Sequence, residues 1–237
     1  MSFPMGVRIL VAAVLCAAPT FAAQAAIVQT NAFNNTVAGL PVSNTDLFQT
    51  NLASVSGTSI SSFGGGTVAV LADGLLGNVG AVFAPDNVAP GNGATITFAL
   101  DTATNPLGYQ ISSLATIASW DTGRDGQSYV VAFSTVSAPT VFTDLFTLTP
   151  YQSPQANFNP ATTSVTLTQD AGDGLLATNV AAIRYTFDTF ENSGTAYREF
   201  DAVGAPVGAA TVPEPTTALL LGMPLLGWLA ARRRNAK

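Results

Sequence analysis

The stretch AAIRYTFD, at residues 181–188, decides the fold class of this chain. Every second position along it is apolar, and polar residues fill most of the positions between. Since successive side chains of a strand point to opposite faces, this alternation predicts a half-buried β-strand. The apolar face carries Ile183, Tyr185 and Phe187, and the polar face carries Arg184, Thr186 and Asp188.

The same short pattern recurs along the middle of the chain, with Gly, Pro, Asn and Asp between the runs. Such residues separate strands, and no stretch between the two ends has a long helical period. The sequence therefore predicts an all-β domain at 26–211 with a jelly-roll or β-sandwich architecture. The expected strands are Thr67–Leu71, Ala94–Leu100, Ile111–Trp120, Ser128–Thr135, Val141–Leu148, Ser164–Thr168, Ala181–Asp188 and Tyr197–Val203.

The composition excludes several kinds of chemistry. The 237 residues include no His, which excludes a Ser-His-Asp triad and His-ligated zinc. The one cysteine, Cys16, lies near the N-terminus, so we expect neither a disulfide nor a thiolate site in the domain. We expect no cofactor.

Charge is distributed unevenly along the chain. Residues 27–211 hold three basic and thirteen acidic side chains, a net charge of −10, while both ends are basic and apolar. Because phosphate binding requires basic clusters, nucleic acid is excluded as a partner. The asymmetry is typical of a processed, exported protein.

The first 25 residues have the features of an export signal. Arg8 precedes the ten-residue apolar run Ile9–Ala18, which is too short to span the ~30 Å of hydrocarbon in a bilayer. Ala23 and Ala25 provide the small residues that signal peptidase accepts. We expect a signal peptide helix that is removed after Ala25.

The last 26 residues combine three features in a fixed order. A Pro213-Glu214-Pro215 triplet comes first, the apolar stretch Thr216–Ala231 follows, and Arg232, Arg233 and Arg234 come last. Sixteen residues cover about 24 Å as a helix, which predicts a short transmembrane helix at 216–231. By the positive-inside rule the arginines stay cytoplasmic, which leaves the domain on the other side of the membrane.

This tail, residues 212–237, resembles the PEP-CTERM sorting domain. The resemblance implies an exosortase-type protease/transpeptidase as partner, with processing at or near the Pro-Glu-Pro triplet. It also implies a Gram-negative envelope that makes extracellular polysaccharide. The chain is then held transiently in the inner membrane, with its domain on the periplasmic side, before it reaches the cell surface or the biofilm matrix. An ordinary tail anchor is the alternative.

A second pattern lies inside the domain, between Asp73 and Gly204. Its segments are Asp73-Gly74, GATITFALD at 93–101, Tyr109–Ile111 leading to Trp120, Arg124 and Tyr129, and YREFDAVG at 197–204. Together they resemble the galactose-binding-domain-like (discoidin-type) jelly roll, whose last strand joins an arginine and an acid to a hydrophobic-Gly ending. The resemblance implies binding of glycans or of another surface through loops at one end of the barrel. The disulfide of many extracellular members is missing.

The most polar predicted loop, WDTGRDGQ at 120–127, is the candidate ligand site. Asp121, Arg124 and Asp125 provide hydrogen-bonding groups for sugar hydroxyls, and Trp120 provides a ring that stacks on a sugar face. The structural alternative places Trp120 in the core and makes Arg124 a bridge to a neighbouring acid.

Other charged residues have alternative interpretations. Arg184 and Arg198 are expected to pair with acids across strands, namely Asp188, Glu191 or Asp201. Glu191 and Glu199 are the only glutamates of the domain, and glycoside hydrolysis requires a pair of carboxyl groups. The runs 86–87 and 170–174 either offer oxygens to a structural calcium or serve as turn residues.

These observations favour a non-enzymatic envelope or extracellular-matrix protein whose domain associates with extracellular polysaccharide. Abundant Thr, Ser and Asn with low charge suit contact with neutral glycans. One alternative is a carbohydrate-active hydrolase that uses an Asp/Glu pair. The other is a purely structural matrix subunit with no defined ligand.

Overall fold

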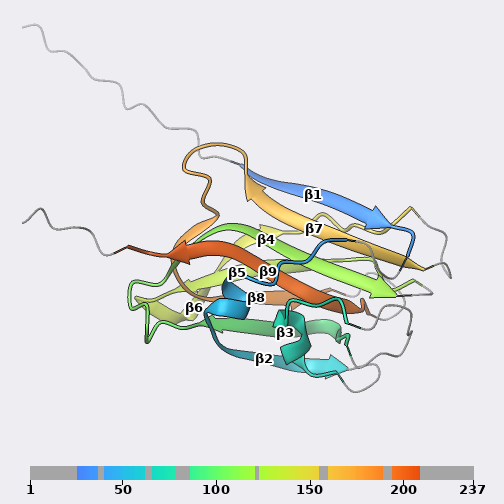
Figure 1. Cartoon of the computed structure of the whole chain (residues 1–237), viewed down its shortest axis with the longest axis horizontal. Coiled ribbons are helices and arrows are strands. Elements are labelled where there is room, and N and C mark those ends of the chain that lie inside the picture. Colours follow the sequence, from blue (N-terminus) through green and yellow to red (C-terminus); the bar gives the residue numbers. More distant parts are fainter. Residues whose placement is uncertain are drawn as a thin grey trace, which may run out of the picture.

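The structure, a computed structural model, describes residues 26–36, 40–61, 66–77, 86–120, 123–154, 160–188 and 194–208. These residues contain nine strands, all antiparallel to their neighbours (Figure 1). The strands are β1 (Ile27–Asn34), β2 (Leu52–Ser61), β3 (Ala89–Leu100), β4 (Tyr109–Trp120), β5 (Tyr129–Thr135), β6 (Ala138–Thr147), β7 (Ala161–Gln169), β8 (Ala177–Phe187) and β9 (Tyr197–Pro206).

The strands form a sandwich of two layers. One layer has the order β2-β3-β8-β5-β6 and the other has the order β1-β7-β4-β9. A short pairing between β4 and β8, at Tyr109 with Val180 and Ile111 with Ala177, links the layers at one corner. The predicted all-β sandwich is therefore confirmed, and its arrangement fits a jelly roll.

Seven of the eight expected strands are present, most of them longer than expected. The expected strand Thr67–Leu71 is wrong, because this stretch forms the 3-10 helix η1 (Val68–Ala72). Val68, Val70 and Leu71 are apolar, as in a strand, but a single helical turn is enough to bury Leu71 completely against β9.

β1, β2 and the short helix α1 (Leu47–Thr50) were not predicted from the sequence. β1 carries Gln29, Asn31 and Asn34, and β2 is rich in Ser with Gly57 at its centre, so neither strand shows a clear apolar alternation. Pairing with β7 and β3 overrides these weak local preferences.

An aromatic cluster fills the space between the layers. The rings of Tyr185 and Phe200 meet edge to face with their centroids 4.7 Å apart, and Phe98 lies 5.5 Å from Phe200. Ile183, Tyr185 and Phe187 are all buried, so the face predicted for this strand is confirmed. Each buried ring contributes about 1.5–3 kcal/mol of transfer free energy, and the cluster joins β3, β8 and β9 across the core.

Both predicted terminal signals, at 1–25 and 212–237, lie outside the described residues. In the part of the chain that the structure describes, no helix has the length and hydrophobicity needed to cross a membrane.

Candidate functional site

The predicted ligand loop at 120–127 follows β4, and its described residues are largely buried. Trp120 is 3% exposed, and Asp125 is equally buried, with one carboxylate oxygen accepting the Ser153 amide at 3.0 Å. Arg124 is half-buried at a positive φ of 91°, and its Nη1 donates to the Gly194 carbonyl at 3.4 Å. Asp121 lies outside the described residues. A ligand-binding role for this loop stays a prediction.

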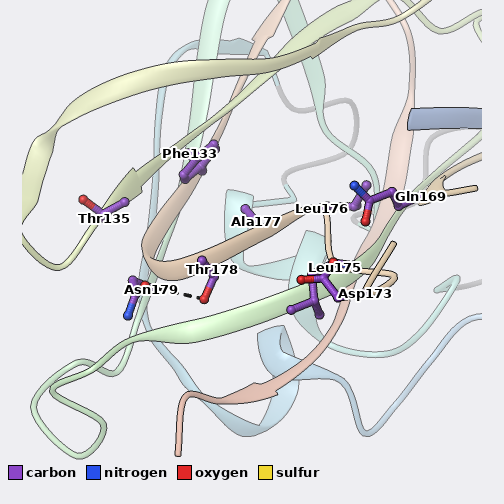
Figure 2. A pocket seen from close by; sticks show the side chains of 9 residues that line it. All are labelled: Phe133, Thr135, Gln169, Asp173, Leu175, Leu176, Ala177, Thr178 and Asn179. Atoms are coloured by element: carbon purple, nitrogen blue, oxygen red, sulfur yellow. Dashed lines mark hydrogen bonds between the residues drawn. The ribbon is translucent and has the colours of Figure 1, made fainter. Parts of the chain in front are cut away.

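A groove lies at the opposite end of the sandwich, where β5 and β7 end and β8 begins (Figure 2). Its volume is about 540 Å³. Ile27, the first residue of β1, pairs with Gln169 at the rim, and Pro206, the last residue of β9, lies opposite Tyr109 at the same end. The lining residues are Phe133, Thr135, Gln169, Asp173, Leu175, Leu176, Ala177, Thr178 and Asn179.

The lining combines amides, hydroxyls and apolar groups. Figure 2 shows Gln169 and Leu176 at one end of the groove and Thr135 and Asn179 at the other. One side-chain oxygen of Gln169, Oε1, is buried without a hydrogen-bond partner among the described residues. A buried acceptor of this kind costs free energy unless a donor reaches it.

The backbone around the groove is held by local hydrogen bonds. Asp173 is the one charged residue among the described residues of the lining, and its Oδ1 accepts the Leu175 amide at 3.0 Å in the loop between β7 and β8. Asn179 adopts a positive φ of 55°, and its amide donates to the Leu107 carbonyl at 3.1 Å. These contacts present the polar side chains on a backbone that is already fixed.

The arginines of the late strands contact main-chain carbonyls and an aromatic ring. Arg198 is fully buried, and its guanidinium donates to the main-chain carbonyls of Ser119 and Leu76 at 3.2 and 3.0 Å. Arg184 lies over the ring of Phe142, with 4.0 Å between the guanidinium carbon and the ring centroid. Among the described residues, neither arginine pairs with Asp188 or Asp201 as expected, because carbonyls and a ring face are nearer to these side chains. Glu191 lies outside the described residues, so a pairing with it stays a prediction.

A cluster of acids is buried where β9 meets α1 and η1. Glu199 accepts hydrogen bonds from the Gln49 side chain at 2.9 Å and from the Gly74 amide at 3.2 Å. Asp201 accepts the Ser43 amide at 3.0 Å and contacts the carboxyl group of Asp46. These contacts fasten both segments onto β9.

Burial sets the protonation of this cluster. Burial, with a smaller contribution from the neighbouring Asp46, raises the pKa of Glu199 to about 9 and the pKa of Asp201 to about 7. One oxygen each of Asp46, Glu199 and Asp201 has no hydrogen-bond partner among the described residues. Since two buried carboxylates repel each other, such oxygens are satisfied when neighbouring acids share a proton.

Two acids of the run 170–174, one of the two candidate calcium-binding runs, have other contacts. Asp170 accepts the Ala26 amide at 2.9 Å, and Asp173 accepts the Leu175 amide, as expected of turn residues. Among the described residues, no group of three or more Asp, Glu, Cys or His side chains is arranged to hold a metal ion.

Comparison with known proteins finds no matching family model and no matching curated protein. The solved structures similar to this chain include carbohydrate-binding modules. A pectin-binding module is 17% identical over 68% of this chain and 94% of its own, with a TM-score of 0.40. A family 32 module from C. perfringens, solved with galactose, is 13% identical over 66% and 96%, with a TM-score of 0.42. A chitosan-binding module from Paenibacillus sp. IK-5 is 16% identical over 65% and 98%, with a TM-score of 0.36.

The groove was not predicted from the sequence. Its lining comes from three strand ends and one loop, over residues 133–179, and no contiguous motif marks it. The Asp-Gly-Leu-Leu segment at 173–176 also occurs at 73–76, but by itself it predicts only a turn.

Proposed function

We propose that this chain is an exported, non-enzymatic protein of the cell envelope or extracellular matrix, and that its β-sandwich associates with extracellular polysaccharide through the groove. The observation that carries this proposal is the lining: two side-chain amides, two threonine hydroxyls and one carboxylate beside the apolar side chains of Phe133 and Leu175.

This mixture suits a sugar ring. Hydroxyl groups of a sugar both donate and accept hydrogen bonds, and Gln169, Asn179, Thr135 and Thr178 can do the same. The C–H faces of a sugar are apolar and pack on apolar side chains such as Leu175.

Sorting is the second part of the proposal. A signal peptide ending at Ala25 and a C-terminal signal at 212–237 would deliver the domain to the periplasmic side and then to the surface. An exosortase-type enzyme would process the chain near Glu214. Intact mass measurement on native membrane and extracellular fractions tests this. We expect a product that begins at Ala26 and ends near residues 212–215, whereas a mature chain that retains Arg232–Lys237 contradicts it.

A non-catalytic role is supported by the position of Glu199. A glycosidase requires two carboxyl groups facing the scissile bond, and Glu199 was one of the two glutamates considered for this task. Its side chain is fully buried against Gln49 and Gly74, away from the groove.

Binding to a panel of soluble polysaccharides, measured by isothermal titration calorimetry, tests the groove. Thr178→Trp places a large ring in it, and we expect a loss of binding of tenfold or more, at least about 1.4 kcal/mol. Thr147→Trp is the matched control, because Thr147 is exposed on β6 outside the groove. Retained binding in Thr178→Trp with a loss in Arg124→Ala would move the site to the predicted loop at 120–127. No binding to any polysaccharide would favour a structural matrix subunit.

A further inference from the structure

β1 is an edge strand with an unusually regular backbone. All eight of its residues pair with β7 in one unbroken register, from Ile27 with Gln169 to Asn34 with Thr162. Among the described strands, only β7 pairs with β1, so its other side is the outer edge of the layer (Figure 1). An edge of this kind leaves main-chain N–H and C=O groups ready to pair with another strand.

The other edges carry features that discourage such pairing. The register of β2 against β3 shifts twice, and β6 contains Pro139 and Asp144 as well as two shifts against β5. β9 is covered by α1 and η1, and the Asp46 carboxylate accepts the Ala202 amide. β1 has no charge, no proline and no bulge, although natural proteins commonly protect edges with these devices.

β1 is also held firmly in place. The Gln29 side chain donates to the Thr149 carbonyl at 2.9 Å and accepts the Thr149 amide at 3.0 Å, which connects β1 to the segment after β6. The backbone of β1 is therefore already ordered, so pairing with a partner strand would cost little conformational entropy on the β1 side.

The sequence of β1 is a chemical palindrome about Thr30. In IVQTNAF, residues 27–33, an amide flanks Thr30 on each side, and two apolar residues flank each amide. An antiparallel pairing of two such strands about Thr30 places Ile27 opposite Phe33, Val28 opposite Ala32, and Gln29 opposite Asn31. Apolar side chains then lie opposite apolar ones, and amides lie opposite amides, on both faces of the sheet. Val28 and Phe33, which are 38% and 42% exposed, become partly covered by the side chains of the second strand.

We propose that β1 pairs antiparallel with β1 of a second copy of this chain, about a two-fold axis at Thr30. The two β1-β7-β4-β9 layers then join into one continuous eight-stranded layer. The domain carries a net charge of −10, so most faces of two copies repel each other, whereas the eight residues of β1 carry no charge. A closed two-fold contact of this kind ends at a dimer.

Position-specific crosslinking of the full chain in detergent micelles tests the proposal. In a Cys16→Ser background, Thr30→Cys places two thiols directly opposite each other, at a Cα separation of about 4.5–5.5 Å that a disulfide can bridge. Ser56→Cys is the matched control, since Ser56 is an exposed residue at the centre of the edge strand β2. We expect a disulfide-linked dimer with Thr30→Cys and little with Ser56→Cys. Equal yields at the two positions would overturn the proposal.

Introducing a charge at the two-fold axis gives a second, independent readout. Thr30→Lys and Thr30→Asp each place like charges opposite each other, and we expect each to weaken the dimer about fivefold in sedimentation measurements. An equimolar mixture of the two variants should recover the dimer, which also shows that both variants are folded. Dimerisation of Thr30→Lys at the level of the unsubstituted chain, or a mixture without recovery, would contradict the two-fold pairing.

Discussion

Asp46 accepts the backbone amide of Ala202 at 3.1 Å, across 156 residues of chain. The same oxygen, Oδ1, accepts the Phe48 amide at 2.8 Å and so caps α1. One carboxylate therefore begins a helix and fixes that helix to the last strand. The Asp46 carboxylate therefore stabilises both the start of α1 and its contact with β9. Its removal leaves two buried backbone amides without a hydrogen-bond acceptor.

Replacement of Asp46 by Ala should lower the free energy of unfolding by about 2–4 kcal/mol, because both amides lose a charge-assisted hydrogen bond. Denaturant unfolding followed by tryptophan fluorescence measures the change. Asp144→Ala on the exposed face of β6 is the control and should stay within about 0.5 kcal/mol of the unsubstituted chain. An equal effect of the two variants would show that the Asp46 contacts do not stabilise the fold.

Stability should fall as the pH rises, because the pKa values of Glu199 and Asp201 are raised in the folded state. From ordinary values of 4.5 and 3.8 they rise to about 9 and about 7, so the folded chain binds more protons than the unfolded chain between these limits. Their contribution is full below about pH 4 and is lost as the pH rises through about 7 and then about 9.

Glu199→Gln isolates the larger part of this effect. The amide mimics the protonated acid and does not titrate, so the variant should lose less stability than the unsubstituted chain as the pH rises. Unfolding curves measured from pH 4 to pH 9 give the free energy of unfolding of each protein as a function of pH. Below pH 9 the slopes of the two proteins should differ by up to about 1.4 kcal/mol per pH unit. Parallel curves for the two proteins would contradict the raised pKa of Glu199.

Gly108 should tolerate no side chain, because it combines a φ of 75° with a close approach of β8. A Cβ atom there would lie 2.7 Å from the Val180 carbonyl oxygen. Gly174 has a similar φ of 72° but open space around it. We expect Gly174→Ala to cost about 1–2 kcal/mol for the backbone conformation alone and Gly108→Ala to cost clearly more. Thermal unfolding of the two variants compares their stabilities. Similar losses of stability would mean that the β8 backbone shifts to make room for the Cβ atom at position 108.

The stacking of Arg184 on Phe142 should give a coupling free energy of about 0.5–1 kcal/mol. A double-mutant cycle with Arg184→Met and Phe142→Leu measures this coupling, since each variant keeps most of the apolar side chain. A coupling near zero would show that the two side chains lie close together without stabilising each other. Binding measurements on the same variants report whether this face also takes part in glycan association.

The class of the fold could be predicted from local pattern, and the physical reason lies in the two-residue period of strands. In β8, Ile183, Tyr185 and Phe187 are placed on one face by chain geometry alone, and in β5 the same holds for Tyr129 and Val131. Long-range pairing decided β1 and β2, whose side chains carry too weak an alternation to be recognised. It also decided η1, since a short apolar run is compatible with either a strand or a helical turn.

The sequence by itself determined the all-β class, most of the strands and the absence of imidazole chemistry, because these depend on composition and on neighbours along the chain. Only the tertiary structure decided that Trp120 and Asp125 are buried, that Arg198 and Glu199 lie in the interior, and that three strand ends and the loop between β7 and β8 form a groove. Burial and proximity arise from contacts between segments far apart in sequence. Asp125, in the loop that is the most polar by sequence, accepts the Ser153 amide inside the fold.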